Sequence, residues 1–235
     1  MKISFVLPFN NEKANLSLLL PLIEQEIKKE NNLEFEINLV DDLSSDESYS
    51  FCEKFIEDSK LKAKYKLYKL DTKGYQTGAL KKGFIESTGD YIICMDTDLQ
   101  DDPKYIPEFI DNIKKGFDIV IGVRKNRKAP VILTAGLKIY DLIFEIIFKK
   151  KLSTYRAPFV AYKKEYVNNL PWYNNDHRYF IPIAINKGAK LIKEFDVSLN
   201  KRNSGKSHYN KYFKVFWGII ELLIFIFRMK TGKYS

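Results

Sequence analysis

The chain alternates between two kinds of apolar pattern along most of its length. Short runs rich in β-branched and aromatic residues predict strands, and apolar residues three or four positions apart predict helices. The predicted strands lie at 3–7, 34–40, 65–70, 90–95 and 119–123, and a helical pattern follows each of them. Runs at 155–162 and 191–197 add two later strands. Because this alternation is typical of βαβ units, it predicts an α/β fold with a mostly parallel central sheet flanked by helices.

An acidic segment follows the strand predicted at 90–95. Asp96, Asp98 and Gln100 bring carboxylate and amide oxygens to the place where open α/β sheets bind ligands, outside the carboxyl ends of the strands. Oxygen ligands of this kind suit a hard divalent ion such as Mg²⁺ or Mn²⁺. The alternative is an acidic turn that caps the next helix. That alternative is the favoured interpretation for Asp102, because Pro103 after it is a natural first helical residue.

The other strand ends also carry polar residues. Asn10 and Glu12 follow the first strand, and Asp41 and Asp42 follow the second. In a chain of net charge +9, an acidic rim needs a cation or hydrogen-bond donors between its members, and a metal-bound nucleotide supplies both. The chain lacks a G-x-G-x-x-G segment after the first strand and lacks a Walker A loop, which argues against NAD enzymes and P-loop NTPases.

Five segments together resemble the successive motifs of family 2 glycosyltransferases. They are VLPFNNE at 6–12, VDDLSSD at 40–46, GDYIICMDTDLQ at 89–100, GVR at 122–124 and RNSGKS at 202–207. Within that family the chain looks most like the branch of dolichol-phosphate-mannose synthase and the polyprenyl-phosphate glycosyltransferases, over roughly residues 1–210. The resemblance implies a GT-A fold, a nucleotide-diphosphate sugar donor, Mg²⁺ or Mn²⁺, and inversion at the anomeric carbon. Two departures are Leu43, where a glycine is usual, and Asn10, where an aromatic residue is common.

Carried over position by position, the resemblance assigns roles to individual residues. The nucleotide-binding residues would be Pro8, Asn10, Glu12, Asp41 or Asp42, Gly74 and Asp96, and the metal ligands would be Asp96, Asp98 and Gln100. Arg124 and Arg202 would contact phosphates and would act with Asp98 in catalysis, as a hexose leaves its diphosphate. Two simpler interpretations stay open: a salt bridge from Arg124 to a strand-end carboxylate, and a solvated basic loop around Arg202.

The acceptor has two candidate chemistries. A polyprenyl phosphate is already an anion at neutral pH, so it needs cations and no general base; Arg127, Lys206 and Ser207 are the candidates to hold its phosphate. A sugar hydroxyl of a lipid-linked glycan, capsule or lipopolysaccharide precursor would instead need a base, and Asp176 is the candidate. For Asp176 the simpler interpretation is an N-cap of the helix that begins at His177. The phosphate acceptor is the favoured hypothesis.

Two segments predict helices that lie on a membrane surface. Residues 131–148 are apolar except for four polar residues that fall on one stripe of a helix, and residues 213–227 contain only two charged residues. Lysines and arginines flank both segments, as in interfacial helices on an anionic bilayer. The alternative is packing in the core or in a dimer interface, so a homo-oligomer stays open. We expect a GT-A domain at 1–210, which includes the helix at 131–148, and a membrane-associated segment at 211–235.

Composition sets the remaining limits. No stretch reaches the ~18 uncharged apolar residues of a transmembrane helix, and no signal-peptide pattern precedes the first strand. Cys52 and Cys94 form no disulfide framework, which fits a reducing compartment. We therefore expect a peripheral protein on the cytoplasmic face of a membrane. A nucleic-acid-binding protein would gather its lysines on one face among aromatic residues, whereas here they are scattered, so no nucleic-acid partner is expected. A membrane scaffold without activity would not need the Asp96 and Asp98 pair.

Overall fold

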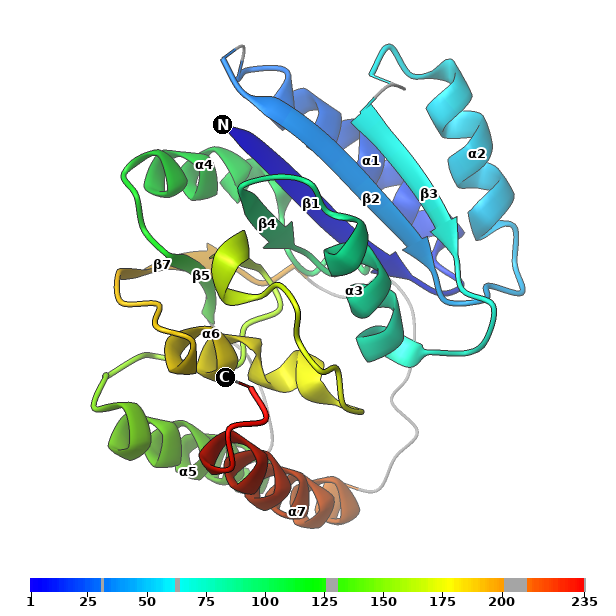
Figure 1. Cartoon of the computed structure of the whole chain (residues 1–235). Coiled ribbons are helices and arrows are strands. Elements are labelled where there is room, and N and C mark those ends of the chain that lie inside the picture. Colours follow the sequence, from blue (N-terminus) through cyan, green and yellow to red (C-terminus); the bar gives the residue numbers. More distant parts are fainter. Residues whose placement is uncertain (31, 62–63, 126–130, 201–210, 235) are drawn as a thin grey trace.

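A computed structural model describes residues 1–30, 32–61, 64–125, 131–200 and 211–234 (Figure 1). Its described strands form a seven-stranded sheet in the order β3-β2-β1-β4-β6-β5-β7. Their bounds are β1 Lys2–Phe9, β2 Glu34–Asp41, β3 Tyr65–Lys69, β4 Tyr91–Cys94, β5 Ile119–Lys125, β6 Val160–Lys163 and β7 Ile192–Ser198. Strand β6 runs antiparallel to β4 and β5, and the other neighbours pair in parallel. The predicted mostly parallel α/β sheet is confirmed.

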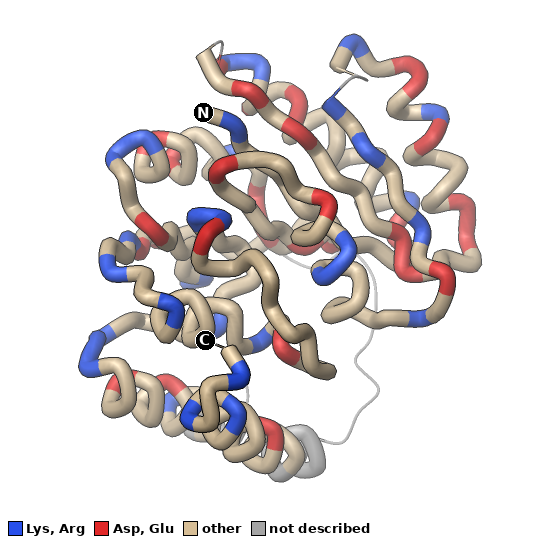
Figure 2. Tube along the Cα trace, in the orientation of Figure 1, with Lys and Arg blue, Asp and Glu red and all other residues tan. Residues whose placement is uncertain are grey.

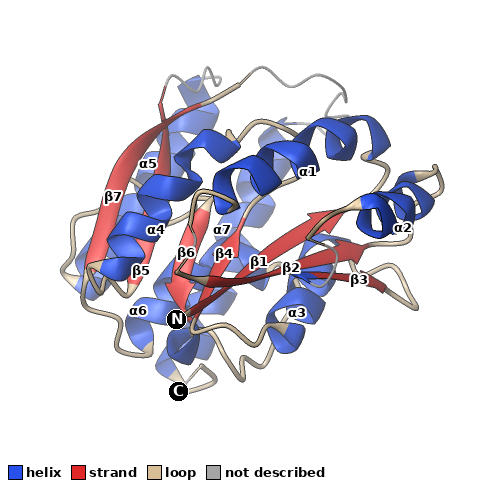
Figure 3. Ribbon diagram, turned by 90° about the horizontal axis from the view of Figure 1, so that it is seen from above, coloured by secondary structure: helices blue, strands red, loops and turns tan. Residues whose placement is uncertain are grey.

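Helices cover both faces of the sheet (Figure 3). Helices α1 (Lys13–Ile27), α2 (Ser48–Asp58) and α4 (Ile106–Lys114) share a core with one face, in which Phe5, Leu19 and Phe109 are fully buried. Helices α3 (Tyr75–Glu86) and α6 (Phe180–Asn186) cover the other face. The outermost elements on that side are α5 (Val131–Phe148) and α7 (Lys211–Lys230), and three short 3₁₀-helices complete the described chain: η2 (Pro103–Tyr105), η3 (Lys164–Tyr166) and η4 (Asp176–Tyr179).

The order of the strands places a ligand site between β1 and β4. After β1 the chain builds β2 and β3 on one side, then returns to place β4 on the other side of β1. At such a switch point the loops after the two strands diverge and leave a crevice at their carboxyl ends. The loops stay joined at its base, because the Thr97 hydroxyl donates to the carbonyl of Pro8 at 3.0 Å. Asn10 to Glu12 and Asp96 to Asp98 therefore face one another across the crevice.

Helices α5 and α7 lie side by side at the edge of the molecule (Figure 1). Phe144 of α5 and Phe225 of α7 are buried against each other, with ring centroids 5.8 Å apart. Their outward faces remain apolar: Ile146 is 68% exposed and Phe227 is 69% exposed. The helical structure of both segments is thus confirmed. Each helix packs one side against the core and exposes apolar residues on the other. None of the helices in the described part of the chain combines the length and the apolar character needed to cross a bilayer.

Candidate functional site

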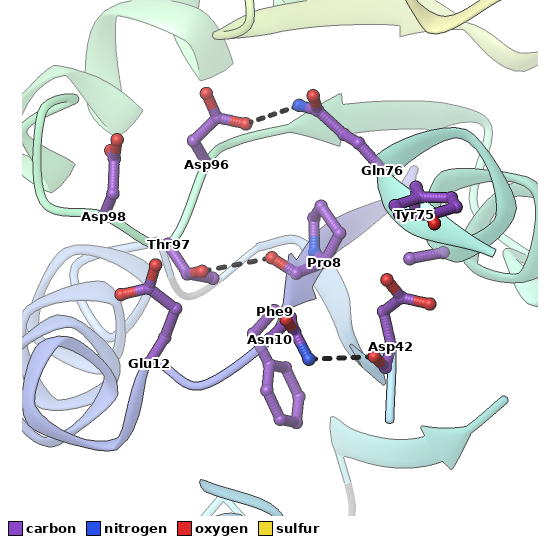
Figure 4. A pocket seen from close by; sticks show the side chains of 11 residues that line it. Pro8, Phe9, Asn10, Glu12, Asp42, Tyr75, Gln76, Asp96, Thr97 and Asp98 are labelled. Atoms are coloured by element: carbon purple, nitrogen blue, oxygen red, sulfur yellow. Dashed lines mark hydrogen bonds between the residues drawn. The ribbon is translucent and has the colours of Figure 1, made fainter. Parts of the chain in front are cut away.

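Two adjoining cavities open at the carboxyl ends of β1 and β4. The outer cavity is lined by strand-end residues that include Pro8, Asn10, Glu12, Asp42, Asp96 and Asp98 (Figure 4). The inner cavity lies beyond it and is lined by Arg124, Arg156, His177 and Arg178, among others. The two share Pro8, Gln76 and Asp96, so they form one continuous site.

The loops around the outer cavity hold strained backbone. Asn11, Leu43, Tyr75 and Leu99 all have positive φ angles, between 51° and 61°, although none is glycine. Each follows a strand of the first half of the sheet or begins the helix after it. Leu43 shows why a glycine is usual at its position, since the left-handed conformation disfavours a side chain with a Cβ atom. Strain of this kind clusters at functional sites, where the surrounding structure holds it in place.

The two aspartates at the end of β2 have different surroundings. Asp42 lines the outer cavity and accepts a hydrogen bond from the Gly74 amide at 2.7 Å, which fixes the start of α3. The amide of Asn10 also reaches this turn and donates to the Asp42 carbonyl at 2.9 Å. Asp41 is fully buried and accepts from the Ser44 amide at 2.9 Å. Of the two residues that the sequence leaves open, only Asp42 reaches the cavity.

Asp96 and Asp98 both line the outer cavity, two residues apart on the loop after β4 (Figure 4). The Gln76 side chain donates a hydrogen bond to Asp96 at 3.0 Å, and the backbone N–H of Gln100 donates to the Asp98 carboxylate at 3.1 Å. Among the described residues there is no group of three or more His, Cys, Asp or Glu side chains able to hold a metal ion. Mg²⁺ is usually held by one or two carboxylates and completes its coordination with water and substrate phosphates. The two half-buried carboxylates of Asp96 and Asp98, which line the cavity, fit that donor set.

Arg124 pairs with a carboxylate that the sequence does not single out. Its guanidinium makes two hydrogen bonds to the buried Asp101, at 2.8 and 2.7 Å, and lies 3.6 Å from Asp96. Burial lowers the pKa of Arg124, but the hydrogen bonds and charge of Asp101 outweigh it and raise the pKa, so the group stays charged. The salt-bridge interpretation of Arg124 is confirmed, and the same side chain also lines the inner cavity. Gln100 does not line the outer cavity, and its side-chain oxygen accepts a hydrogen bond from Arg124 at 3.3 Å.

The inner cavity contains three residues that sequence reasoning missed. Arg156 comes from the loop before β6, and His177 and Arg178 come from η4. Arg156 lies 3.4 Å from Asp141 and over the ring of Tyr140, 4.8 Å from its centroid. These residues lie far apart in the sequence, so no spacing signal connects them. The only available hint was their charge beside predicted apolar elements.

An apolar groove continues the inner cavity outward between α5 and α7. Its walls include Ile139, Ile143, Trp217, Ile219, Leu222 and Leu223. Arg156 and Arg178 line both the groove and the inner cavity, so they stand at the boundary between a polar and an apolar compartment. Arg178 also pairs with Glu221 of α7 at 2.6 Å.

Two predictions about helix caps have different outcomes. Asp102 is the N-cap of η2, since its carboxylate accepts from the Lys104 amide at 3.0 Å. The cap interpretation of Asp176 is wrong, because Asn175 occupies the N-cap position. The Asp176 carboxylate, 2% exposed, instead accepts from the Tyr173 amide and the Tyr234 hydroxyl, both at 2.8 Å. Its two oxygens are thus occupied in a structural role behind the cavity wall.

Four predicted site residues lie outside the described residues: Arg127, Arg202, Lys206 and Ser207. Their predicted contacts with phosphates stay predictions.

Solved structures confirm the class of fold. The chain superimposes on glucosyl-3-phosphoglycerate synthase from Mycobacterium tuberculosis in complex with Mn²⁺, UDP and glucosyl-3-phosphoglycerate, with a TM-score of 0.70. The match covers 95% of this chain and 78% of that one at 15% sequence identity. The same enzyme with Mn²⁺ and UDP-glucose gives a TM-score of 0.68. The fold is therefore the GT-A fold of nucleotide-diphosphate-sugar transferases.

Sequence comparison then gives the family. The model of glycosyl transferase family 2 matches residues 4–170, and the chain belongs to that family. One curated relative, the undecaprenyl-phosphate 4-deoxy-4-formamido-L-arabinose transferase of Photorhabdus laumondii, is 31% identical over 89% of this chain. The Klebsiella pneumoniae transferase of the same name is 29% identical. The chain spans 63% of the length of each of these relatives.

The Arg124–Asp101 pair makes a testable contribution to stability. Arg124→Met leaves the Asp101 carboxylate buried without its partner, so we expect the free energy of unfolding to fall by about 3–5 kcal/mol. Urea denaturation followed by circular dichroism measures it. Lys125→Met is the matched control, since Lys125 and Asp196 pair in the open, with side chains 60% and 65% exposed, and that loss should stay below about 1 kcal/mol. Equal losses in the two variants would show that the buried pair stabilises the fold no more than the exposed pair does.

Proposed function

We propose that this protein transfers a sugar from a nucleotide-diphosphate sugar to a polyprenyl phosphate at a membrane surface, with inversion at the anomeric carbon. The observation that carries the proposal is the sequence of three connected compartments. An acidic outer cavity continues into a cationic inner cavity, and the inner cavity continues into an apolar groove. A metal-bound donor diphosphate, an acceptor phosphate and a hydrocarbon chain would complement these three compartments in this order.

The outer cavity suits the donor. We assign the nucleoside to Pro8, Glu12 and Asp42, with Asn10 and Gly74 shaping the turn around it. Asn10 cannot stack on a base, and we assign that role to Tyr75. The residue is 70% exposed and lines the same cavity. Asp96 and Asp98 would hold Mg²⁺ or Mn²⁺, which stabilises negative charge on a departing diphosphate as a Lewis acid. The solved neighbour in complex with Mn²⁺ and UDP-glucose supports this donor class.

The inner cavity suits an acceptor that is already anionic. Arg156 and Arg178 present guanidinium groups, which bind phosphate through charge-assisted and often bidentate hydrogen bonds. A phosphate oxygen placed there attacks the anomeric carbon without loss of a proton, so no general base is required. The occupied carboxylate of Asp176 agrees with this route and does not favour a sugar-hydroxyl acceptor. Arg124, fixed by Asp101, would contact the diphosphate from the side of Asp96.

The experiment that tests the proposal is a donor screen with undecaprenyl phosphate in detergent. Nucleoside diphosphate release is followed with Mn²⁺, with Mg²⁺ and with a chelator, over hexose and pentose donors, because the relatives are named for an arabinose derivative. We expect release that depends on both lipid and metal. Asp98→Asn should lower the rate by about 100-fold or more. Asp102→Asn is the matched control, because asparagine caps a helix as well as aspartate does. Release that is indifferent to the lipid would reject the acceptor assignment.

Tyr75 provides a separate test of the nucleoside site. Stacking of a base on an aromatic ring contributes about 1–3 kcal/mol, so Tyr75→Ala should weaken nucleoside diphosphate binding by about tenfold or more. Isothermal titration calorimetry with uridine and guanosine diphosphates, in the presence of Mn²⁺, measures the affinity. Tyr75→Phe keeps the ring and the backbone strain and should bind like the wild type. An affinity that is the same in all three proteins would remove Tyr75 from the site.

We further propose that α5 and the C-terminal segment 211–235 place the protein on the cytoplasmic surface of an anionic membrane. Exposed apolar residues form a stripe on each helix: Ile139, Leu142 and Ile146 on α5, and Ile219, Leu223 and Phe227 on α7. Three lysines follow α5 at 149–151, and Arg228 and Lys230 lie in the last turn of α7 (Figure 2). An apolar face with cationic ends matches the interface of an anionic bilayer.

The membrane proposal predicts the effect of charge on this face. The double variant Ile146→Asp/Phe227→Asp should weaken binding to vesicles that contain phosphatidylglycerol by about tenfold or more, because each substitution removes about 1.5–3 kcal/mol of apolar burial. Vesicle sedimentation measures the binding. Leu18→Asp on α1, where the native side chain is 55% exposed on the opposite side of the sheet, is the control for an added charge. If Leu18→Asp weakened binding as much, the α5–α7 face would not be the membrane surface.

A further inference from the structure

One hydrogen bond joins the two walls of the site. The Thr77 hydroxyl of α3 lies 2.7 Å from Nδ1 of His177, which is 100 residues further along the chain in η4. Thr77 follows Gln76, the residue that binds Asp96 in the outer cavity. His177 precedes Arg178, which stands at the mouth of the apolar groove. The contact therefore connects the donor wall to the acceptor wall.

The contact also determines which nitrogen of the imidazole is left to bind a ligand. The ring has two nitrogens, and Thr77 engages Nδ1, so Nε2 is the nitrogen left for the inner cavity that His177 lines. Burial and the charge of Arg178 lower the pKa of His177 to about 4, so the ring is neutral at neutral pH and carries one proton. When the Thr77 hydroxyl donates to Nδ1, that proton resides on Nε2.

The arginines of the inner cavity favour a ligand with several acceptor atoms. Arg124, Arg156 and Arg178 line the same cavity, and all three carry only donors. A ligand that satisfies several donors at once has several acceptor oxygens, as a phosphate does. A neutral donor adds a directed hydrogen bond to such a ligand without a further positive charge to hold beside the arginines.

We propose that His177 donates a hydrogen bond from Nε2 to a phosphate oxygen of the lipid acceptor, and that Thr77 holds the ring in the tautomer that allows it. The inference rests on the proposed function and adds a substrate-contacting residue to it. The role differs from that of Arg156 and Arg178, because an imidazole held on its far side points one donor in one direction. It orients the attacking oxygen, whereas the arginines supply charge.

Two amide substitutions separate the substrate contact from the structural one. Asparagine places its amide near the position of Nδ1 and keeps a partner for Thr77, whereas glutamine reaches the position of Nε2 and can donate into the cavity. We expect His177→Asn to lower kcat/KM for undecaprenyl phosphate by about 10- to 100-fold, the effect of losing a hydrogen bond to a charged group. His177→Gln should stay within a few fold of the wild type. Thr77→Val should lower kcat/KM less than His177→Asn does, since the ring remains but its tautomer is no longer held.

The measurement is steady-state kinetics with the lipid and the nucleotide sugar varied in turn, together with the melting temperature of each variant. A purely structural role predicts the reverse order, with asparagine active and glutamine impaired, and would overturn the proposal. An effect confined to the KM of the nucleotide sugar would overturn it too, since the contact would then be with the donor. Failure of the proposed function itself is distinguishable, because the wild-type protein would then show no lipid-dependent turnover at all.

Discussion

The structure depends on how negative charge is balanced at the end of β4. Asp96, Asp98 and Asp101 follow one strand within a few residues, and like charges so close destabilise a fold unless cations lie between them. Arg124 from the end of β5 binds Asp101 in two places, at 2.8 and 2.7 Å, and approaches Asp96 to 3.6 Å. The Arg124–Asp101 ion pair thus neutralises the most deeply buried of these carboxylates. Asp96 and Asp98 line the outer cavity, so the proposed metal ion would add positive charge where two further carboxylates gather.

The loops that carry these groups also have unusual backbone conformations. Left-handed backbone at a non-glycine residue costs roughly 1–2 kcal/mol, and the rim of the outer cavity holds four such residues. Side chains stabilise the conformation locally: the Asn11 amide oxygen accepts from the backbone of Ser45 at 2.7 Å and of Asp46 at 3.2 Å, which ties the first strand-end loop to the second. A substrate that enters this rim meets a shape that is already formed. Less binding energy is then needed to order the loops, and more is available to orient the reacting groups.

How far the sequence predicts the molecule depends on the range of each interaction. Strands, helices and the Asp102 cap follow from local patterns, and they agree with the structure within a few residues, except that the strand predicted at 155–162 begins only at Val160. The polar rim follows from a topological rule, because parallel strands bring their carboxyl ends to one edge. Side-chain direction at that edge does not follow: only packing shows that Asp41 is buried while Asp42 faces the cavity. Asp176 shows the same limit, since its partner Tyr234 is 58 residues away and no local pattern links them.

The inner cavity was the hardest part to predict because it lies at the boundary between polar and apolar surroundings. Arg156 and Arg178 sit between a polar cavity and an apolar groove, and each is held by a carboxylate of the outer helices, Asp141 on α5 and Glu221 on α7. Charged groups beside an apolar wall are stable when they are paired, so the helices that form the groove also fix the arginines. In the proposed reaction, an incoming phosphate would compete with these carboxylates for the same guanidinium groups. The packing of α5 against α7 is therefore coupled to the charge available for the proposed acceptor, because the same ion pairs join the helices to the inner cavity.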